Sequence, residues 1–290
     1  MSNLKFEIKK LRIIVTGGSG YLGVHVRRFF RADDFSRRAG FNVLSADDAA
    51  RLDDYDVVIH LAAHLDKNPA AAEECFRTNT EGTANVLRHL RPGAVFIYAS
   101  TKDVYGAHAN AYMEVPETCP TDYCGQSALE WSKLIGERLV DYYAAARGLR
   151  ACIFRLSGIY ARPSEGNEPG FVTHYVEAIK RGQALRLPAD GTPVRDILHV
   201  DDLARACRAF IDSSSARGLY NLGGGRANAV SLRELCETVG RIAELEPQFD
   251  ETADAPAPIP INYISDLTLI RRELGWQPTI SIEDGLRDLL

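Results

Sequence analysis

The chain has 290 residues, of which 46% are hydrophobic and 25% are charged, and its formal net charge at pH 7 is −5. This length and composition are typical of one large folded domain or two smaller ones, and they exclude a disordered chain. The negative charge argues against general binding to nucleic acid or to anionic membranes.

The sequence predicts neither a secretion signal nor a membrane span. The first ten residues mix charges with single apolar positions, and no later stretch has the roughly 18 apolar residues of a membrane helix. We therefore expect a cytoplasmic protein. Its six cysteines are scattered without the paired spacing of a zinc site, which indicates reduced thiols and no metal.

The first predicted element is a short buried strand at 11–16, followed by a helix at 21–31. Between them lies the glycine-rich turn Thr16-Gly17-Gly18-Ser19-Gly20-Tyr21-Leu22-Gly23. Glycines at such a turn let the backbone approach a pyrophosphate, whose charge then rests on free N–H groups of the following helix. The turn therefore indicates a dinucleotide site, although the same spacing also occurs in ordinary loops.

Further along the chain, apolar runs that predict strands alternate with stretches that predict helices. Strands are expected at 56–62, 94–100 and 150–156, and helices at 73–90 and 128–146, the second ending at Gly148. Such alternation predicts an α/β fold of Rossmann type, with a doubly wound parallel sheet. We expect residues 1–160 to form mainly the dinucleotide-binding domain.

After Tyr160 the alternation becomes irregular, and residues 161–290 are expected to form mainly a small C-terminal substrate-binding region. The apolar run at 219–223 again predicts a strand of the large sheet. We therefore expect the segment 197–224 to return to that sheet, so that the two regions are interleaved.

Six blocks of the sequence together resemble one protein family. They include the glycine turn, Asp56-Val57-Val58-Ile59-His60-Leu61-Ala62-Ala63 and Ser100-Thr101-Lys102-Asp103-Val104-Tyr105-Gly106, and the others lie at 79–85, 195–202 and 274–278. In this order they resemble the extended short-chain dehydrogenase/reductases that modify nucleotide sugars, including epimerases, 4,6-dehydratases and 4-keto reductases. The resemblance implies a nicotinamide dinucleotide at the carboxyl ends of the strands. It assigns cofactor contacts to Gly17, Gly20, Tyr21, Leu22, Gly23, Leu61, Ala62, Ala63 and Lys133.

The choice between NAD and NADP depends on the second strand. Only about 30 residues separate Gly23 from Asp56, which is short for this fold, and we expect residues 41–45 to be the only strand between them. Asp47 would then bind the adenosine ribose and favour NAD, unless it merely caps a short helix. Arg37 and Arg38 would instead attract a 2′-phosphate, so NADP is not excluded.

The catalytic residues of the family match this chain only in part. The family uses a Ser or Thr, a Tyr that shuttles a proton, and a Lys four residues later that lowers the pKa of the Tyr. Lys133 matches that Lys, but Leu129 occupies the place of the Tyr. Tyr123 would supply a hydroxyl only if a shifted loop brought it into the pocket, and otherwise it is an ordinary loop tyrosine.

The block around residue 101 carries the other candidates for catalysis. Thr101 matches the hydroxyl that binds the sugar O4, beside Ser100, and Asp103 lies where dehydratases of the family keep the acid that removes the C5 proton. Asp103 would act as a base if burial raised its pKa, with Lys102 or Tyr123 as the acid. The alternative is a solvated salt bridge between the two side chains.

Three further residues are candidates for the substrate site. By resemblance, Arg195 pairs with the diphosphate, a task that suits its planar guanidinium, and Arg162 assists it. His174 lies near the second acid or base of some epimerases. The alternatives are an ion pair of Arg195 with Asp196 or Asp201 and a solvent-facing histidine.

Taken together, these features predict an NAD(P)-dependent enzyme for a nucleoside-diphosphate sugar, with epimerase or dehydratase-like chemistry that removes a proton next to a 4-keto group. One alternative is a 4-keto-sugar reductase that uses Tyr123, and another is a non-catalytic protein that binds NAD and nucleotide sugars. The resemblance also implies a homodimer formed through the helices at 73–90 and 128–146.

Overall fold

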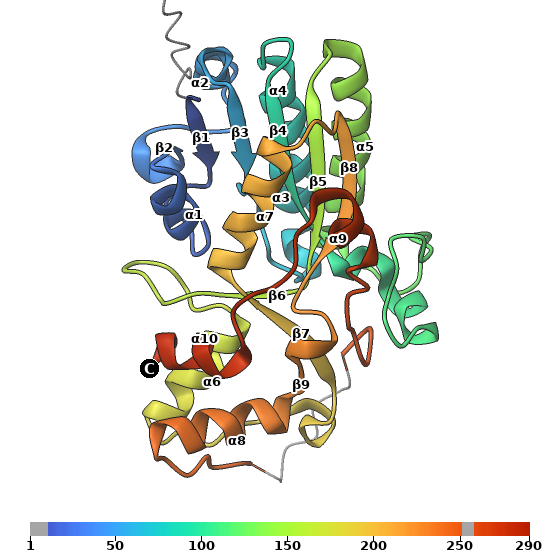
Figure 1. Ribbon diagram of the computed structural model, residues 1–290. Coiled ribbons are helices and arrows are strands. Elements are labelled where there is room, and N and C mark those ends of the chain that lie inside the picture. Colours follow the sequence, from blue (N-terminus) through green and yellow to red (C-terminus); the bar gives the residue numbers. More distant parts are fainter. Residues whose placement is uncertain (1–10, 251–257) are drawn as a thin grey trace, which may run out of the picture.

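A six-stranded parallel sheet, in the order β2-β1-β3-β4-β5-β8, forms the centre of the computed structural model (Figure 1). The structure describes residues 11–250 and 258–290, so the expectation about a signal peptide in residues 1–10 lies outside it. The strands are β1 (Ile13–Thr16), β2 (Asp33–Phe35), β3 (Val57–His60), β4 (Val95–Thr101), β5 (Arg150–Leu156) and β8 (Arg217–Leu222).

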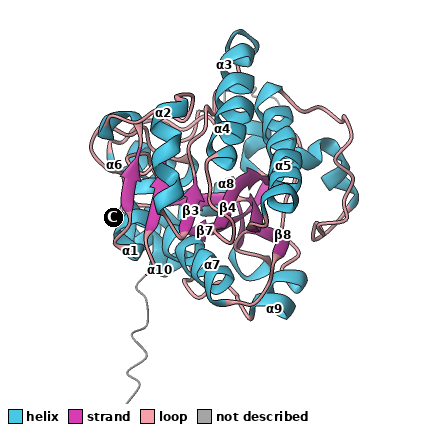
Figure 2. Cartoon of the chain, turned by 90° about the horizontal axis from the view of Figure 1, so that it is seen from above, coloured by secondary structure: helices cyan, strands magenta, loops and turns pink. Residues whose placement is uncertain are grey.

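Helices cover both faces of this sheet because its central strands are apolar on both sides. In β1, Ile13 and Val15 point into one core and Ile14 into the other. Figure 2 shows the strands between two helical layers. One layer contains α1 (Gly23–Phe30) and α7 (Val200–Asp212), and the other contains α2 (Ala46–Ala49), α3 (Ala72–Phe76), α4 (Gly82–Arg88) and α5 (Ala128–Arg147). The predicted doubly wound Rossmann-type sheet is thus confirmed.

Most predicted elements lie at their expected places. The strand at 150–156 is β5, and the helix at 128–146 is α5, which ends at Gly148 in a left-handed conformation with φ of 66°. The predicted helix at 73–90 consists of α3, a π-helical turn at Arg77–Glu81 and α4.

The second strand is the exception, since residues 41–45 form no strand and β2 lies at Asp33–Phe35 instead. Residues 41–45 look strand-like because Phe41 and Val43 are apolar. Both side chains cover the edge of the core, where the Phe41 ring stacks on Phe35 at 5.1 Å. The prediction of a strand at 41–45 was therefore wrong.

A smaller part lies at the carboxyl edge of the large sheet, below it in Figure 1. Its three-stranded sheet has the order β6-β7-β9, and its own core includes Val176, Leu235 and Leu286. The chain returns to the large sheet through α7 and β8, while α9 contacts β8. The remaining elements are β6 (Gly158–Tyr160), β7 (Val194–His199), β9 (Ala229–Ser231), α6 (Phe171–Lys180), α8 (Leu232–Ala243), α9 (Thr268–Leu274) and α10 (Ile282–Leu289).

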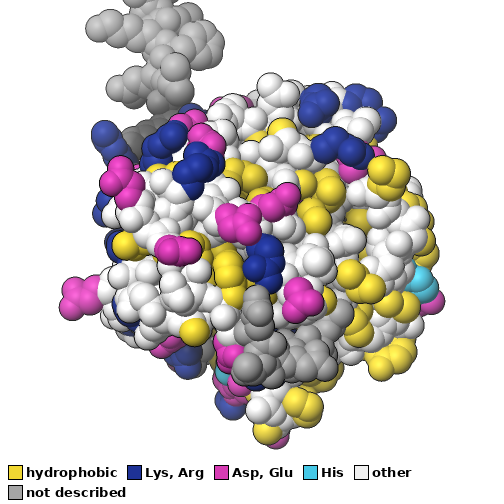
Figure 3. Space-filling view, turned by 90° about the horizontal axis from the view of Figure 1, so that it is seen from below, with side chains coloured by type: hydrophobic (Ala, Val, Ile, Leu, Met, Phe, Trp, Pro, Cys, Tyr) yellow, Lys and Arg dark blue, Asp and Glu magenta, His cyan; other side chains and the backbone are white. Residues whose placement is uncertain are grey.

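The surface of this smaller part is mixed in charge. On the face in Figure 3, basic and acidic side chains are interspersed with apolar ones. Within residues 11–250 and 258–290, no helix is long and apolar enough to cross a membrane.

Candidate functional site

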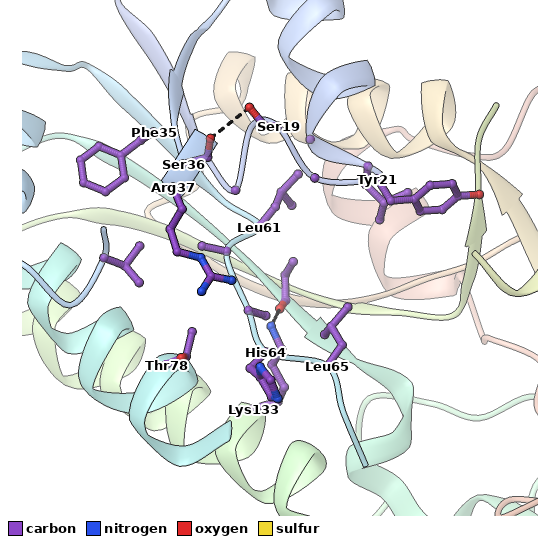
Figure 4. Close-up of a pocket in the computed structure, with 18 of the residues that line it drawn as sticks. Ser19, Tyr21, Phe35, Ser36, Arg37, Leu61, His64, Leu65, Thr78 and Lys133 are labelled. Atoms are coloured by element: carbon purple, nitrogen blue, oxygen red, sulfur yellow. Dashed lines mark hydrogen bonds between the residues drawn. The ribbon is translucent and has the colours of Figure 1, made fainter. Parts of the chain in front are cut away.

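A cavity of about 730 Å³ opens at the carboxyl ends of the strands of the large sheet. Each of five strands contributes a residue at or just after its end: Gly17 after β1, Phe35 in β2, Leu61 after β3, Thr101 in β4 and Leu156 in β5. Open α/β sheets bind their ligands at this edge. Figure 4 shows side chains from these elements around the cavity.

The glycine turn at one side of the cavity has a shape that other residues would not permit. Gly17 has φ of +69°, and a Cβ placed on it would lie 2.8 Å from the Ala62 nitrogen. A Cβ on Gly23 would lie 2.1 Å from the Gly17 oxygen, so the start of α1 packs directly on the turn. Such a close, bare backbone next to a helix start fits a pyrophosphate. All the cofactor residues expected from the resemblance line this cavity except Asp47.

Asp47 does not reach the cavity. It is exposed in the first turn of α2, and its expected role depended on the strand at 41–45 that the structure does not contain. The assignment of Asp47 to the adenosine ribose is therefore corrected.

Lys133 lies at the other end of the cavity, on α5. Its Nζ donates a hydrogen bond to the Ala99 oxygen at 2.7 Å and lies 5.1 Å from the centre of the Tyr98 ring. Burial lowers the pKa of Lys133 to about 8, with the charge of Glu137 opposing this shift. Leu129, one helical turn earlier, lines the same cavity and is only 6% exposed. Its side chain thus occupies the expected tyrosine position with no group that can exchange a proton.

Ser100 and Thr101, at the end of β4, also line the cavity. The Ser100 hydroxyl donates to Glu137 Oε1 at 2.6 Å, and Thr101 Oγ1 accepts from the Asp103 nitrogen at 3.2 Å. Both side chains are therefore fixed by neighbours, and both line the cavity as expected.

A second cavity, of about 230 Å³, adjoins the first where β4 ends and where α6 begins. Its charged lining consists of Lys67, Lys102, Asp103 and Arg195. The Arg195 guanidinium donates to the backbone oxygens of Pro260 and Ile261 at 2.8 and 2.7 Å. Within the described chain Arg195 makes no ion pair with Asp196 or Asp201, so the alternative of a structural ion pair is not supported.

Asp103 is held between two ammonium groups. Lys102 contacts one of its oxygens, and Lys67 lies 2.9 Å from the other. Burial alone would raise the pKa of Asp103, but the two lysines outweigh burial and hold the pKa well below its usual range. The predicted condition for a base, a pKa raised by burial, is therefore not met. Burial lowers the pKa of Lys102, although Asp103 opposes the shift.

Three predicted residues lie outside both cavities. Tyr123 is 70% exposed and its ring stacks against Trp131 at 6.4 Å. Arg162 pairs with Asp288 on the surface at 3.1 Å. His174 is exposed on α6. We correct these assignments, including the reductase alternative that depended on Tyr123.

The sequence analysis missed two charged residues of the site, Lys67 and Glu130. Lys67 bridges the carboxylates of Asp103 and Glu130, at 2.9 and 2.7 Å. Its place in the loop after β3 was the available signal, because loops at the carboxyl ends of parallel strands gather around the ligand. His64, in the same loop, also lines the larger cavity.

Residues 13–223 match the family described as the NAD dependent epimerase/dehydratase family. The chain belongs to this family. NAD as the cofactor class and nucleotide-sugar chemistry in the family are thus in line with the expectation from the sequence.

Individual relatives agree with this assignment. The dTDP-glucose 4,6-dehydratase of Neisseria meningitidis serogroup B is 28% identical, over 95% of this chain and 91% of its own length. The dTDP-glucose 4,6-dehydratase of Streptomyces griseus is 30% identical, over 90% and 76%. The structure of the UDP-glucuronic acid 4-epimerase of Bacillus cereus, in complex with UDP-glucuronic acid and NAD, is 22% identical with a TM-score of 0.81, over 96% of this chain and 98% of that chain. That likeness shows the fold.

Proposed function

We propose that this chain binds a nicotinamide adenine dinucleotide in the larger cavity, and that it dehydrates or epimerises a nucleoside-diphosphate sugar by removing a proton next to a 4-keto group. The observation that carries the proposal is the half-buried Lys102–Asp103 pair where the two cavities adjoin. Relatives named as dehydratases and epimerases of nucleotide sugars support the substrate class.

In this proposal the glycine turn accepts the pyrophosphate and Lys133 donates to the nicotinamide ribose. When bound, the dinucleotide supplies a nicotinamide ring that can accept or return a hydride. Leu129 cannot take the proton of a 4-hydroxyl group, so we expect a sugar that already carries the 4-keto group to be the better substrate.

Arg195 and Lys67 bring positive charge to the second cavity, where the diphosphate would bind. Arginine suits a diphosphate because its planar guanidinium makes two charge-assisted hydrogen bonds with phosphate oxygens. Phe171, Tyr175 and Leu232 supply apolar lining beside these charges.

Lys102 is the stronger base of the half-buried pair. In the proposed step the deprotonated amine of Lys102 takes the proton, and the contacting carboxylate of Asp103 stabilises the ammonium that forms. The electron pair of the broken C–H bond moves to the ketone oxygen, to which the Thr101 hydroxyl would donate. Lys102 can then give its proton to the hydroxyl that leaves the neighbouring carbon, which releases water. Inversion would need a second donor on the opposite face, and His174 does not reach the cavities, so dehydration is the simpler outcome.

The test is incubation of the protein in deuterated water with the dinucleotide and a panel of nucleoside-diphosphate 4-keto sugars, followed by NMR. We expect deuterium next to the ketone or loss of water. Lys102→Met should slow this by about 100-fold or more, in the range of general acid–base catalysis. Lys180→Met removes the same charge from the exposed end of α6 and should change nothing. Undiminished deuterium exchange in Lys102→Met would contradict the assignment of Lys102 as the base.

A non-catalytic binding protein is the second candidate. It is favoured by Leu129 at the tyrosine position and by the exposed place of Tyr123, which together leave the redox step without its proton carrier. This candidate requires both ligands to bind, with no deuterium exchange and no product on any sugar of the panel.

We further propose a cytoplasmic homodimer. The six free cysteines support the cytoplasmic location, because reduced thiols are typical of that compartment. The dimer is supported by the exposed apolar side chains of Phe76 on α3 and of Ile135 and Tyr142 on α5. Sedimentation should give twice the chain mass of 32.0 kDa, and Tyr142→Lys should shift it toward the monomer. A wild-type monomer at micromolar concentration would contradict the dimer.

A further inference from the structure

We infer that the larger cavity selects the 2′-phosphorylated dinucleotide, NADP(H), over NAD(H), and that Arg37 at the end of β2 makes the selection. The inference rests on the proposed function only in taking this cavity as a dinucleotide site. In dinucleotide folds an acid near the end of the second strand binds the ribose hydroxyls of NAD, whereas an arginine there accommodates the 2′-phosphate of NADP.

The residue in the ribose-binding place is Ser36, directly after β2. The Gly17 nitrogen donates to the Phe35 oxygen at 2.8 Å, which fixes the end of β2 beside the glycine turn. The Ser36 hydroxyl donates to Ser19 Oγ at 3.0 Å (Figure 4). A short neutral hydroxyl therefore stands where NAD selection requires a carboxylate.

The carboxylates of β2 itself are turned to other partners. Asp34 accepts from the Ser19 hydroxyl and pairs with Arg27 at 2.5 Å. Its other oxygen is buried against Gly18, where an added Cβ would lie 2.6 Å away. Asp33 accepts from the hydroxyl of Tyr55 at 2.8 Å. Neither aspartate lines the cavity, so neither is placed to bind a ribose hydroxyl there.

Arg37 and Arg38 both line the cavity, but they are not equivalent. Arg38 donates to the Ser19 oxygen at 2.8 Å, to Asn167 Oδ1 at 3.1 Å and to the Gly166 oxygen, so its guanidinium fixes a loop across the cavity. Figure 4 shows the Arg37 side chain extending into the cavity. Within the described residues the side chain of Arg37 has no hydrogen bond or ion pair, so its guanidinium remains available for a phosphate.

The charge of the cavity favours an additional phosphate. Its lining contains the cationic side chains of Arg37, Arg38, Arg77 and Lys133, against one carboxylate among the described lining residues, that of Glu74. Glu74 belongs to α3 and accepts from Thr78 Oγ1 at 3.1 Å. NAD in the family name and in the neighbouring structure indicates the class of cofactor, whereas the choice between NAD and NADP depends on the residues after β2 in this chain.

The test is calorimetric titration of the full chain with NADP⁺ and NAD⁺, and with 2′,5′-ADP and 5′-AMP as probes of the adenosine end. We expect NADP⁺ to bind about tenfold or more tightly than NAD⁺, which corresponds to about 1.4 kcal/mol, and 2′,5′-ADP to bind more tightly than 5′-AMP. Arg37→Ala should abolish the preference with little loss of NAD⁺ affinity. Arg28→Ala removes the same charge from an exposed position on α1 outside the cavity and should leave the preference intact.

The outcomes separate this inference from the proposed function. Equal or tighter binding of NAD⁺, or an unchanged preference in Arg37→Ala, would overturn the selection by Arg37 while leaving the cavity a dinucleotide site. Failure of both dinucleotides to bind would overturn the proposed cofactor site itself. The double change Ser36→Asp with Arg37→Ala should reverse the preference toward NAD⁺, and since both positions lie at the surface of the cavity we expect it to fold.

Discussion

Lys133 and Leu129 define the chemistry of the larger cavity at the scale of single residues. They lie one turn apart on α5 and line the same space. A pKa of about 8 means that Lys133 changes its charge close to neutral pH. Leu129 occupies the place of the tyrosine whose proton this lysine would help to transfer. We therefore expect the residue pair to retain cofactor binding and to lose the ordinary redox step.

The lowered pKa of Lys133 makes stability depend on pH. In the unfolded chain the pKa is 10.5, so between about pH 8 and pH 10.5 the unfolded state binds more protons. Stability should then rise with pH through this window relative to Lys133→Met, by about 3 kcal/mol. Urea unfolding of the two proteins across the window measures the difference. Parallel curves would mean that burial does not lower this pKa.

Placing a tyrosine at position 129 tests whether the missing phenol hydroxyl is what prevents the redox step. Leu129→Tyr should gain reduction of the dinucleotide with a nucleotide sugar that carries a 4-hydroxyl, because the phenol would lie one turn from the Lys133 ammonium. Leu129→Phe is the control of similar size. We expect the Tyr variant to exceed the Phe variant by about 100-fold, the lower end of general acid–base effects, in absorbance at the nicotinamide band. Equal rates would show that the sugar end of the pocket does not admit the reaction.

At the scale of elements, the start of α5 sets the geometry of the site. Ser127 Oγ accepts from the Leu129 nitrogen at 3.3 Å, and Glu130 accepts from the Ser127 nitrogen at 2.7 Å. These reciprocal bonds form a capping box. Glu130 also contacts Lys67 in the second cavity at 2.7 Å, so the same box connects α5 to the charged cluster.

The helix α8 offers a matched comparison for this cap. It begins with an equivalent box at Ser231 and Glu234, outside the larger cavity that is the proposed dinucleotide site. Ser127→Ala and Ser231→Ala should each lower the free energy of unfolding by about 1 kcal/mol, the usual cost of losing such a cap. Only Ser127→Ala should also weaken dinucleotide binding in calorimetry. Equal effects of both variants on binding would contradict a role of the α5 cap in the site.

The sequence predicts the strands with a long apolar run correctly, and it fails for the short strand at the edge of the sheet. The apolar runs of β3, β4 and β5 are buried on both faces, so their strands could be predicted. The edge strand β2 has only three residues, two of them aspartates. Such a strand carries no apolar run, and its pairing with β1 depends on tertiary structure. The error at 41–45 then misplaced the ribose acid.

At the scale of the whole molecule, one buried ion pair joins the sheet to α5 behind the site. Arg155 on β5 pairs with Glu137 on α5 at 2.7 Å, and both side chains are almost fully buried. Glu137 also accepts from Ser100 on β4. The pair thus connects two strands and a helix whose ends carry the candidate catalytic residues.

Breaking this pair should be costly, because it leaves a buried charge without its partner. Glu137→Gln should lower the free energy of unfolding by about 3 to 5 kcal/mol. The exposed pair of Arg208 and Asp212 on α7 is the control, and Asp212→Asn should cost less than about 1 kcal/mol. Urea unfolding measures both. A small loss in Glu137→Gln would show that the pair is dispensable.

More of the overall fold than of the charged candidate site could be predicted from the sequence. The glycine turn, the parallel sheet and the return of β8 to that sheet follow from periodicity and spacing. The ion pair between Lys67 and Asp103 joins residues that are far apart in the chain, so no local sequence pattern predicts it. For the same reason the pKa of Asp103 could not be predicted, since a buried carboxylate between two lysines and one without them look alike in sequence.

The central claim is that the Lys102–Asp103 pair moves a proton on a 4-keto nucleotide sugar, and the most direct measurement is NMR of that reaction in deuterated water. We expect deuterium at the carbon next to the ketone, or loss of water, with wild-type protein and with Lys180→Met. The signal should be lost in Lys102→Met. Binding of the dinucleotide and of the sugar nucleotide without exchange on any sugar of the panel would contradict the claim and leave a binding protein.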